Sequence, residues 1–104
     1  MSEDIVIHYH GFHPSEASAL MLQNLLEEVR EEAPYGAAVR ASFNRKDGVI
    51  KGILQVNSAV GPFFAVSSGE EIHEVAQTLM RRIRRRMEKW KSRRYRESGI
   101  GLGA

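Results

Sequence analysis

The sequence predicts a two-layer α+β domain of the order β-α-β-β-β-α, in which two helices pack on one face of a four-stranded mixed sheet. Its 104 residues fit one compact domain. Apolar residues alternate with polar ones in four short segments and recur at steps of three and four in two longer segments. The first long segment lies between two short ones, so a helix can connect two adjacent parallel strands while hairpins supply the rest. The second face of the sheet is expected to be open.

The first strand is predicted at residues 5–10, where β-branched residues and a tyrosine alternate with other side chains. The first helix is predicted at residues 15–32, because leucine and valine recur there at steps of three and four. Ser15 fits the N-cap position, where its hydroxyl can accept a hydrogen bond from the first turn. Ala-Pro-Tyr-Gly at residues 33–36 is expected to end this helix.

Three further strands are predicted at residues 38–43, 49–57 and 63–68, each with an alternating apolar pattern. Asp-Gly at residues 47–48 is a strong hairpin signal, because these two residue types readily adopt positive φ. The next turn is predicted at Gly-Pro, residues 61–62. These strands complete the four-stranded sheet.

The last helix is predicted at residues 70–91, opened by Ser-Ser-Gly-Glu-Glu at residues 67–71. Its apolar residues continue at helical spacing through a strongly basic segment, so the chain up to Trp90 is expected to be folded and not a disordered basic tail. We predict one domain at residues 1–96 and a flexible tail at residues 97–104. The apolar stripe of this helix consists of Ile72, Val75, Ala76, Leu79, Met80, Ile83, Met87 and Trp90.

Charge is segregated along the chain, although the formal net charge is only +2. Residues 1–80 carry five basic and eleven acidic side chains, whereas residues 81–96 carry ten basic side chains and one acid, Glu88. A concentration of one sign at one end of a protein indicates a partner of the opposite sign.

On a helical wheel, one flank of the last helix is a row of cations. Like charges one turn apart repel by about 0.2–0.5 kcal/mol per pair, and Glu88 is the only acid of the segment that could relieve them. Arginine dominates, and its guanidinium makes bidentate contacts with phosphate and stacks on bases. The pattern predicts an RNA-binding surface that recognises backbone and shape. Its residues are Arg82, Arg86, Lys89 and Arg93, with Arg85 and Arg96 a little farther round the helix.

Two other interpretations of the basic flank stay open. The cations can form a solvated helix face that also favours the negative C-terminal end of the helix dipole. They can also bind a membrane surface, although the apolar stripe is needed to cover the sheet. Arg81, Arg84 and Lys91 fall on the opposite flank or the outer face, and Lys91 is kept as an additional candidate RNA contact.

Three histidines near the N-terminus, His8, His10 and His13, form a His-x-His-x-x-His cluster. Two of them share a strand face and could approach a zinc or copper ion, but a site needs a third ligand and support that the pattern does not fix. The histidines fit the open sheet face better, where His8 and His10 are further candidate RNA contacts. The chain contains no cysteine and no glycine-rich phosphate loop. We therefore predict no enzymatic activity, metal, cofactor or small-molecule substrate.

Aromatic residues near the basic segment fit more than one role. Trp90 can close the core at the end of the helix or stack on a base. Phe63 and Phe64 cannot both face inward on a regular strand. One of them is therefore expected to be exposed, as an RNA-stacking group or as part of a partner interface.

The segment MSEDIVIHYH lacks the basic and apolar regions of a secretory signal, and no apolar run approaches the length of a membrane span. A cytoplasmic location and no membrane association are therefore expected. The sequence predicts no particular oligomeric state.

Two segments resemble the ribosome hibernation-promoting factor family, also called the sigma-54 modulation or protein Y family. Residues 15–17, Ser-Glu-Ala, are similar to the Thr-Glu-Ala that opens the first helix of that family. Residues 69–77 are similar to its Gly-x-Asp-Met-Tyr-Ala-Ala-Ile-Asp helix opening, although Asp-Met-Tyr-Ala-Ala is here Glu-Ile-His-Glu-Val. The match continues through the basic segment and covers about residues 5–91. Arg81 replaces a usual acid, and Tyr9 stands where Gly is common.

The resemblance implies a βαβββα domain that binds the small ribosomal subunit. Members of the family lie against 16S rRNA in the channel for mRNA and tRNA, and so inhibit translation in idle ribosomes under stress. Carried over by position, Arg82, Arg85, Arg86 and Lys89 are the implied rRNA contacts. The chain is too short for the second domain of long members, so ribosome dimerisation through that domain is not expected.

Two alternative functions also fit the residues. One is a generic structured-RNA-binding domain with a layout close to double-stranded RNA-binding folds. The other is a small metal-dependent enzyme or metal carrier that uses the histidines.

Overall fold

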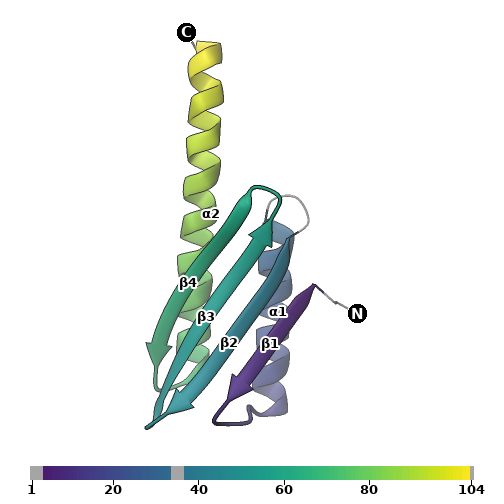
Figure 1. Ribbon diagram of the computed structural model, residues 1–104, viewed down its shortest axis with the longest axis vertical. Helices are drawn as coiled ribbons and strands as arrows, with labels where there is room; N and C mark the ends of the chain where they lie inside the picture. The colour runs from purple at the N-terminus through teal and green to yellow at the C-terminus, as the bar shows by residue number, and fades with distance from the viewer. Residues whose placement is uncertain (1–3, 34–36, 104) are drawn as a thin grey trace.

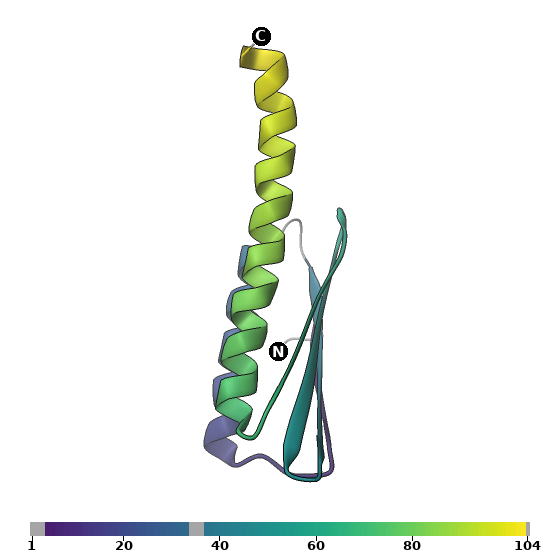
Figure 2. The same cartoon turned by 90° about the vertical axis from the view of Figure 1, so that its left-hand side faces the viewer.

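The computed structural model describes residues 4–33 and 37–103, with side chains described as far as Ser92. Four strands and two helices follow one another in the predicted order β-α-β-β-β-α, and both helices cover one face of the sheet (Figures 1 and 2). The predicted fold class is therefore confirmed. The elements are β1 (Ile5–His10), α1 (Glu16–Glu32), β2 (Ala38–Lys46), β3 (Val49–Ser58), β4 (Gly61–Gly69) and α2 (Ile72–Gly103).

The sheet has the strand order β1-β2-β3-β4, with β1 parallel to β2 and the other two pairs antiparallel. The parallel pair is connected by α1, as a parallel connection requires a crossover. Strands β1 and β4 are consequently the two edges of the sheet. The face opposite the helices is called the open face below.

The core lies between the sheet and the two helices. Side chains alternate strictly along β3, where Ile50, Leu54 and Val56 are buried under the helices. Gly52 shares their face and allows the close approach of α2, because a Cβ there would lie 2.8 Å from a methyl group of Val75. The predicted apolar stripe of α2 is buried from Val75 to Met87, so this stripe fixes the helix on the sheet.

The start of α1 and the first hairpin follow their sequence signals. The hydroxyl of Ser15 accepts a hydrogen bond from the backbone N–H of Ser18, as an N-cap does. Asp47 and Gly48 have φ of 55° and 78°, the positive values of a two-residue hairpin turn. The predicted end of α1 falls partly on residues 34–36, which lie outside the described residues.

The second hairpin turn was predicted two residues too late. It consists of residues 59–60, and β4 begins at Gly61. The hydroxyl of Ser58 accepts from the N–H of Val60 and donates to the carbonyl of Gly61, which closes the turn before the Gly-Pro pair. Pro62 is tolerated within β4 because β4 is an edge strand, where one N–H is not needed for pairing.

Helix α2 begins later and ends later than predicted. Strand β4 continues through Gly69, so the helix begins at Ile72, and its backbone is helical as far as Gly103. Its C-terminal part extends past the sheet (Figure 1). The division between a domain at residues 1–96 and a flexible tail at residues 97–104 stays a prediction.

Candidate nucleic-acid interface

A groove follows the seam between α2 and the edge strand β4. Three adjoining hollows form it, with volumes of about 530, 350 and 300 Å³. The first and second share Val66 and Arg82, and the second and third share Arg86 and Lys89. The three hollows thus adjoin one another from Lys51 and Thr78 at one end to Phe64 and Trp90 at the other, and together they are called the β4–α2 groove below.

Four cations of the predicted row lie along this groove. Arg82, Arg85, Arg86 and Lys89 line the middle hollow together with Ala65 and Val66 of β4. All four are exposed. The buried stripe of α2 determines this placement, because a helix held by Ile83 and Met87 must direct its adjacent flank to the edge of the sheet.

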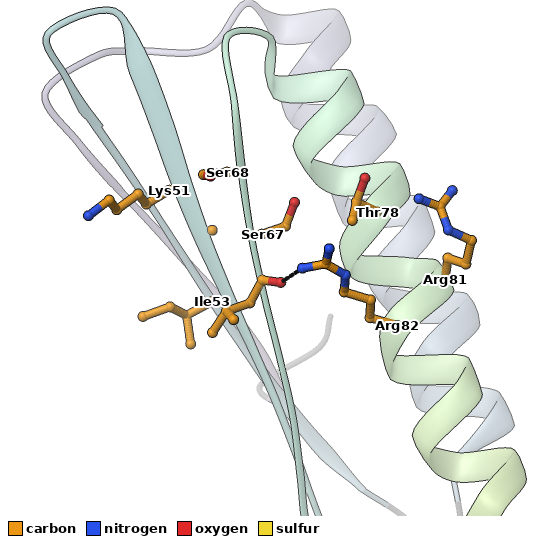
Figure 3. A pocket seen from close by; sticks show the side chains of 9 residues that line it. Lys51, Ile53, Ser67, Ser68, Thr78, Arg81 and Arg82 are labelled. Carbon is orange, nitrogen blue, oxygen red and sulfur yellow. Dashed lines mark hydrogen bonds between the residues drawn. The ribbon is translucent and has the colours of Figure 1, made fainter.

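Arg82 also contacts the main chain of the edge strand. Its Nη1 donates a hydrogen bond of 2.5 Å to the carbonyl oxygen of Val66, which Figure 3 shows between α2 and β4. This bond satisfies a carbonyl of the edge strand and holds the arginine over the groove. Thr78 and Ser67 lie beside it in the first hollow.

Among the described residues, Arg85, Arg86 and Lys89 form no ion pair and no side-chain hydrogen bond. Arg84 on the other flank differs, since its Nε and Nη2 donate to both carboxylate oxygens of Glu32 at 2.9 Å, and Nη2 also reaches Glu28 at 3.2 Å. The hydrogen bond to Glu32 is the main reason that the pKa of Arg84 is raised. The acids that neutralise Arg84 come from α1, which inspection of the basic segment alone did not indicate. The groove flank thus keeps its positive charge uncompensated by the described side chains.

Aromatic side chains line the third hollow, at the end of the groove nearest the C-terminal part of α2. Phe63 is 9% exposed and packs edge to face against Trp90, with ring centroids 6.4 Å apart. Phe64, its neighbour, is 48% exposed and lines the third hollow with Arg86 and Lys89. The expectation that only one of the two phenylalanines faces inward is confirmed, and Trp90 packs against the core.

The other predicted contacts lie apart from the row. Lys91 and Arg84 line a hollow on the α1 side of the helix together with Glu31, Glu32 and Glu88. Arg81, placed by the wheel on the opposite flank or outer face, lines the first hollow of the groove. Arg93 and Arg96 lie on the helical backbone of α2, but their side chains are outside the described part of the chain.

The histidines are on the far edge of the sheet from the basic row. His8 and His10 are exposed on the open face of β1 with their rings 6.3 Å apart. Strand β1 is three positions from β4 in the sheet, roughly 14 Å at the usual strand spacing. No group of three or more His, Cys, Asp or Glu side chains in the described part of the chain is arranged to hold a metal ion.

One contact between the helices was not expected from the sequence. His73 Nε2 of α2 lies 3.2 Å from the hydroxyl of Ser18, which also accepts a hydrogen bond from Ser15. His73 itself is exposed, whereas Ser18 is buried. The contact joins the first turns of the two helices.

The fold defines a class of small α+β domains with both helices on one face of a four-stranded sheet. Neither a family model nor a curated protein matches this chain by sequence. Two solved structures share the fold. A ribosomal subunit interface protein from Coxiella burnetii is 15% identical, with a TM-score of 0.66 over 85% of this chain and 97% of that one. The N-terminal domain of Protein Y from Thermus thermophilus is 7% identical, with a TM-score of 0.72 over 82% of this chain and 94% of that one.

These structures confirm the fold that the resemblance implied. At such low identity the likeness concerns the arrangement of the elements and not the residues of a site. Within the described residues, no helix is long and apolar enough to cross a membrane.

Proposed function

We propose that this protein binds the small ribosomal subunit through the β4–α2 groove and keeps the ribosome from translating by occupying the path of mRNA and tRNA. The groove cations would contact rRNA phosphates, and no catalysis would be involved. The observation that carries this proposal is the uncompensated row of Arg85, Arg86 and Lys89 on a fold shared with a ribosomal subunit interface protein.

The charges of the row favour RNA as its partner. A solvated helix face would interleave acids with its bases, as happens on the opposite flank where Arg84 meets Glu28 and Glu32. The groove flank instead keeps three cations without an ion pair among the described residues, which costs repulsion within the helix. Phosphates would supply the missing negative charge and the acceptors for arginine. A cytoplasmic location is part of this proposal.

The first experiment is co-sedimentation of the purified protein with small ribosomal subunits at low and at high salt. We expect binding at low salt that falls steeply as salt rises, because each phosphate contact adds roughly 0.7–0.9 to the slope of log affinity against log salt. Addition of the protein to a translation extract should lower protein synthesis. Equal binding to large subunits would contradict the small-subunit assignment, and equal binding to naked duplex RNA would favour a generic RNA-binding domain.

The site is tested by the double variant Arg86→Glu with Lys89→Glu. Its matched control is Arg40→Glu with Lys46→Glu, two exposed cations of β2 whose reversal changes the net charge equally. The α2 variant should bind small subunits more than about tenfold less tightly, since charge-assisted hydrogen bonds contribute roughly 1.5–3 kcal/mol each. If the β2 control loses as much affinity, net charge and not the groove determines binding.

A further inference from the structure

The β4–α2 groove combines two features, and an RNA duplex would use only the first of them. Its middle carries the cations, while its C-terminal end carries an exposed aromatic ring, Phe64, beside Arg86 and Lys89. A duplex presents phosphates to a cationic surface and keeps its bases stacked inside. An unpaired strand, by contrast, has base faces that can stack on an aromatic side chain.

The apolar surface around Phe64 extends onto the open face of the sheet. Val66 is 58% exposed, and it pairs across the sheet with Ile53, which is 50% exposed. Phe64 and Val66 are two residues apart on β4, so their side chains are on the same face. An exposed apolar patch next to uncompensated cations indicates a partner with both planar apolar and anionic groups.

We propose that the β4–α2 groove holds a single-stranded segment of RNA, with its phosphates on Arg82, Arg85, Arg86 and Lys89 and an unpaired base stacked on Phe64. Thr78 and Trp90 are twelve residues apart on α2, which is roughly 18 Å at 1.5 Å per residue. This length accommodates about five stacked nucleotides at about 3.4 Å each. The inference rests on the proposed function, because it specifies which form of RNA the same groove takes.

Two other occupants fit the groove less well. A second copy of the chain would bring a second row of cations against the first. A peptide added as a strand to β4 would need the main-chain groups of its free edge, yet the carbonyl of Val66 already accepts from Arg82. An acidic peptide lying across the groove would satisfy the cations, but it would leave Phe64 without a planar partner.

The sole tryptophan of the chain provides a direct signal, because Trp90 lines the same hollow as Phe64. The experiment titrates the full-length protein with RNA oligonucleotides of about eight nucleotides, a usual size for such sites. Oligouridylate, oligoadenylate and a blunt duplex of equal length are compared, with tryptophan emission and fluorescence anisotropy as readouts. We expect the single strands to bind more tightly than the duplex and to change the tryptophan emission.

Variants of Phe64 separate base stacking from general apolar contact. Phe64→Ala and Phe64→Leu should each weaken oligonucleotide binding by about 5- to 150-fold, the range measured for loss of one stacked base. Phe64→Tyr should restore it, because a phenol ring stacks as well. The matched control is Leu20→Ala, which removes an exposed apolar side chain of α1 that is 62% exposed and should leave binding unchanged.

Three results would overturn the inference: a duplex that binds as tightly as the single strands, a Phe64→Leu variant that binds like the wild type, or polyglutamate of matched charge that produces the same tryptophan signal. Co-sedimentation of the same variants with small subunits separates this inference from the proposed function. If Phe64→Ala binds single strands and duplex as the wild type does, and still sediments with small subunits, the stacked strand is ruled out while ribosome binding stands. If the wild-type protein does not sediment with small subunits at all, the proposed function itself is ruled out.

Discussion

At the scale of single residues, Tyr9 combines a well-packed ring with a poorly placed hydroxyl. Its ring stacks on Phe43 at 5.8 Å and meets the edge of Phe12 at 5.7 Å. Its hydroxyl is buried and has no hydrogen-bond partner within the described residues. Burial raises the pKa of Tyr9 above its ordinary value of 10.0, since the phenolate would lose its hydration. The packing of the ring therefore stabilises the folded protein, whereas the burial of the hydroxyl destabilises it.

We expect Tyr9→Phe to raise the free energy of unfolding at pH 7 by about 1 kcal/mol, because an unsatisfied buried hydroxyl costs roughly that much. The variant should also lose less stability in alkali. A folded-state pKa raised above the unfolded value gives stability that is fully present below about pH 10 and is lost as the pH rises through the folded pKa. Urea unfolding at pH 7 and at about pH 10.5 measures both effects.

The other two tyrosines of the chain ionise in wild type and variant alike, so the difference between the two proteins reports Tyr9. A variant that unfolds at lower urea than wild type at pH 7 would mean that the hydroxyl has a favourable partner.

At the scale of elements, α2 has two basic flanks with different surroundings. Arg84 joins α2 to α1 through Glu28 and Glu32. Arg85, the next residue, is exposed on the groove side and has no ion-pair partner among the described residues. Adjacent arginines on one helix thus differ in their contacts because the helix turns them toward different neighbours.

The pair provides a matched test. Arg84→Ala should lower the free energy of unfolding by about 0.5–1 kcal/mol at low salt, less at high salt, and should leave small-subunit binding nearly unchanged. Arg85→Ala should do the reverse: a change in stability within about 0.5 kcal/mol, but weaker binding to small subunits. Urea unfolding and co-sedimentation measure the two quantities.

If Arg84→Ala and Arg85→Ala change stability and small-subunit binding equally, one flank does not serve stability while the other serves binding. Glu28→Gln with Glu32→Gln is a further check, because it should reproduce the stability loss of Arg84→Ala without removing a cation.

At the scale of the whole molecule, α2 makes the protein long and narrow. Its extents are 55 × 29 × 18 Å, and the C-terminal part of α2 projects beyond the sheet (Figure 2). The core residues of α2 end with Trp90, whereas the helix continues to Gly103. The projecting part carries arginines without taking part in the described core.

Removal of residues 93–104 should therefore change stability by less than about 1 kcal/mol and weaken ribosome binding. The deletion removes three arginines and one glutamate. The slope of log affinity against log salt should become shallower by about 2, because each lost phosphate contact removes roughly 0.7–0.9. Sedimentation at several salt concentrations gives this slope.

The control keeps the full length and replaces Arg93, Arg94 and Arg96 by glutamine. A slope that falls equally in the control and the deletion assigns the effect to charge. A deletion that unfolds at much lower urea would mean that the extension stabilises the core.

Sequence signals predicted an element well where its formation depends on residues close together in the chain. The alternation around Leu54, the N-cap at Ser15 and the Asp47-Gly48 turn all depend on residues close in sequence. The second turn was misplaced because the Gly61-Pro62 pair is the stronger signal, while the turn is closed by the side chain of Ser58. The end of α2 was also misplaced, since the apolar stripe stops at Trp90 while the helix continues to Gly103.

The candidate site was predictable in part. Helical periodicity places Arg82, Arg86 and Lys89 on one flank from sequence alone. That the flank faces β4 and adjoins Phe64 depends on how the helix docks, and no local pattern contains that information. The pairing of Arg84 with Glu32 joins residues 52 positions apart for the same reason.

The sequence by itself determined the apolar stripe of α2, the order of the elements and the segregation of positive charge into α2, because periodicity and composition are properties of neighbouring residues. Only the tertiary structure decided which cations are compensated and which are available to a partner. The docking of α2 gives Arg84 two carboxylates from α1, and it sets Arg86 and Lys89 beside an exposed aromatic on the edge strand. Compensation of charge is a matter of distance in space, and that distance is fixed by packing between elements far apart in the chain.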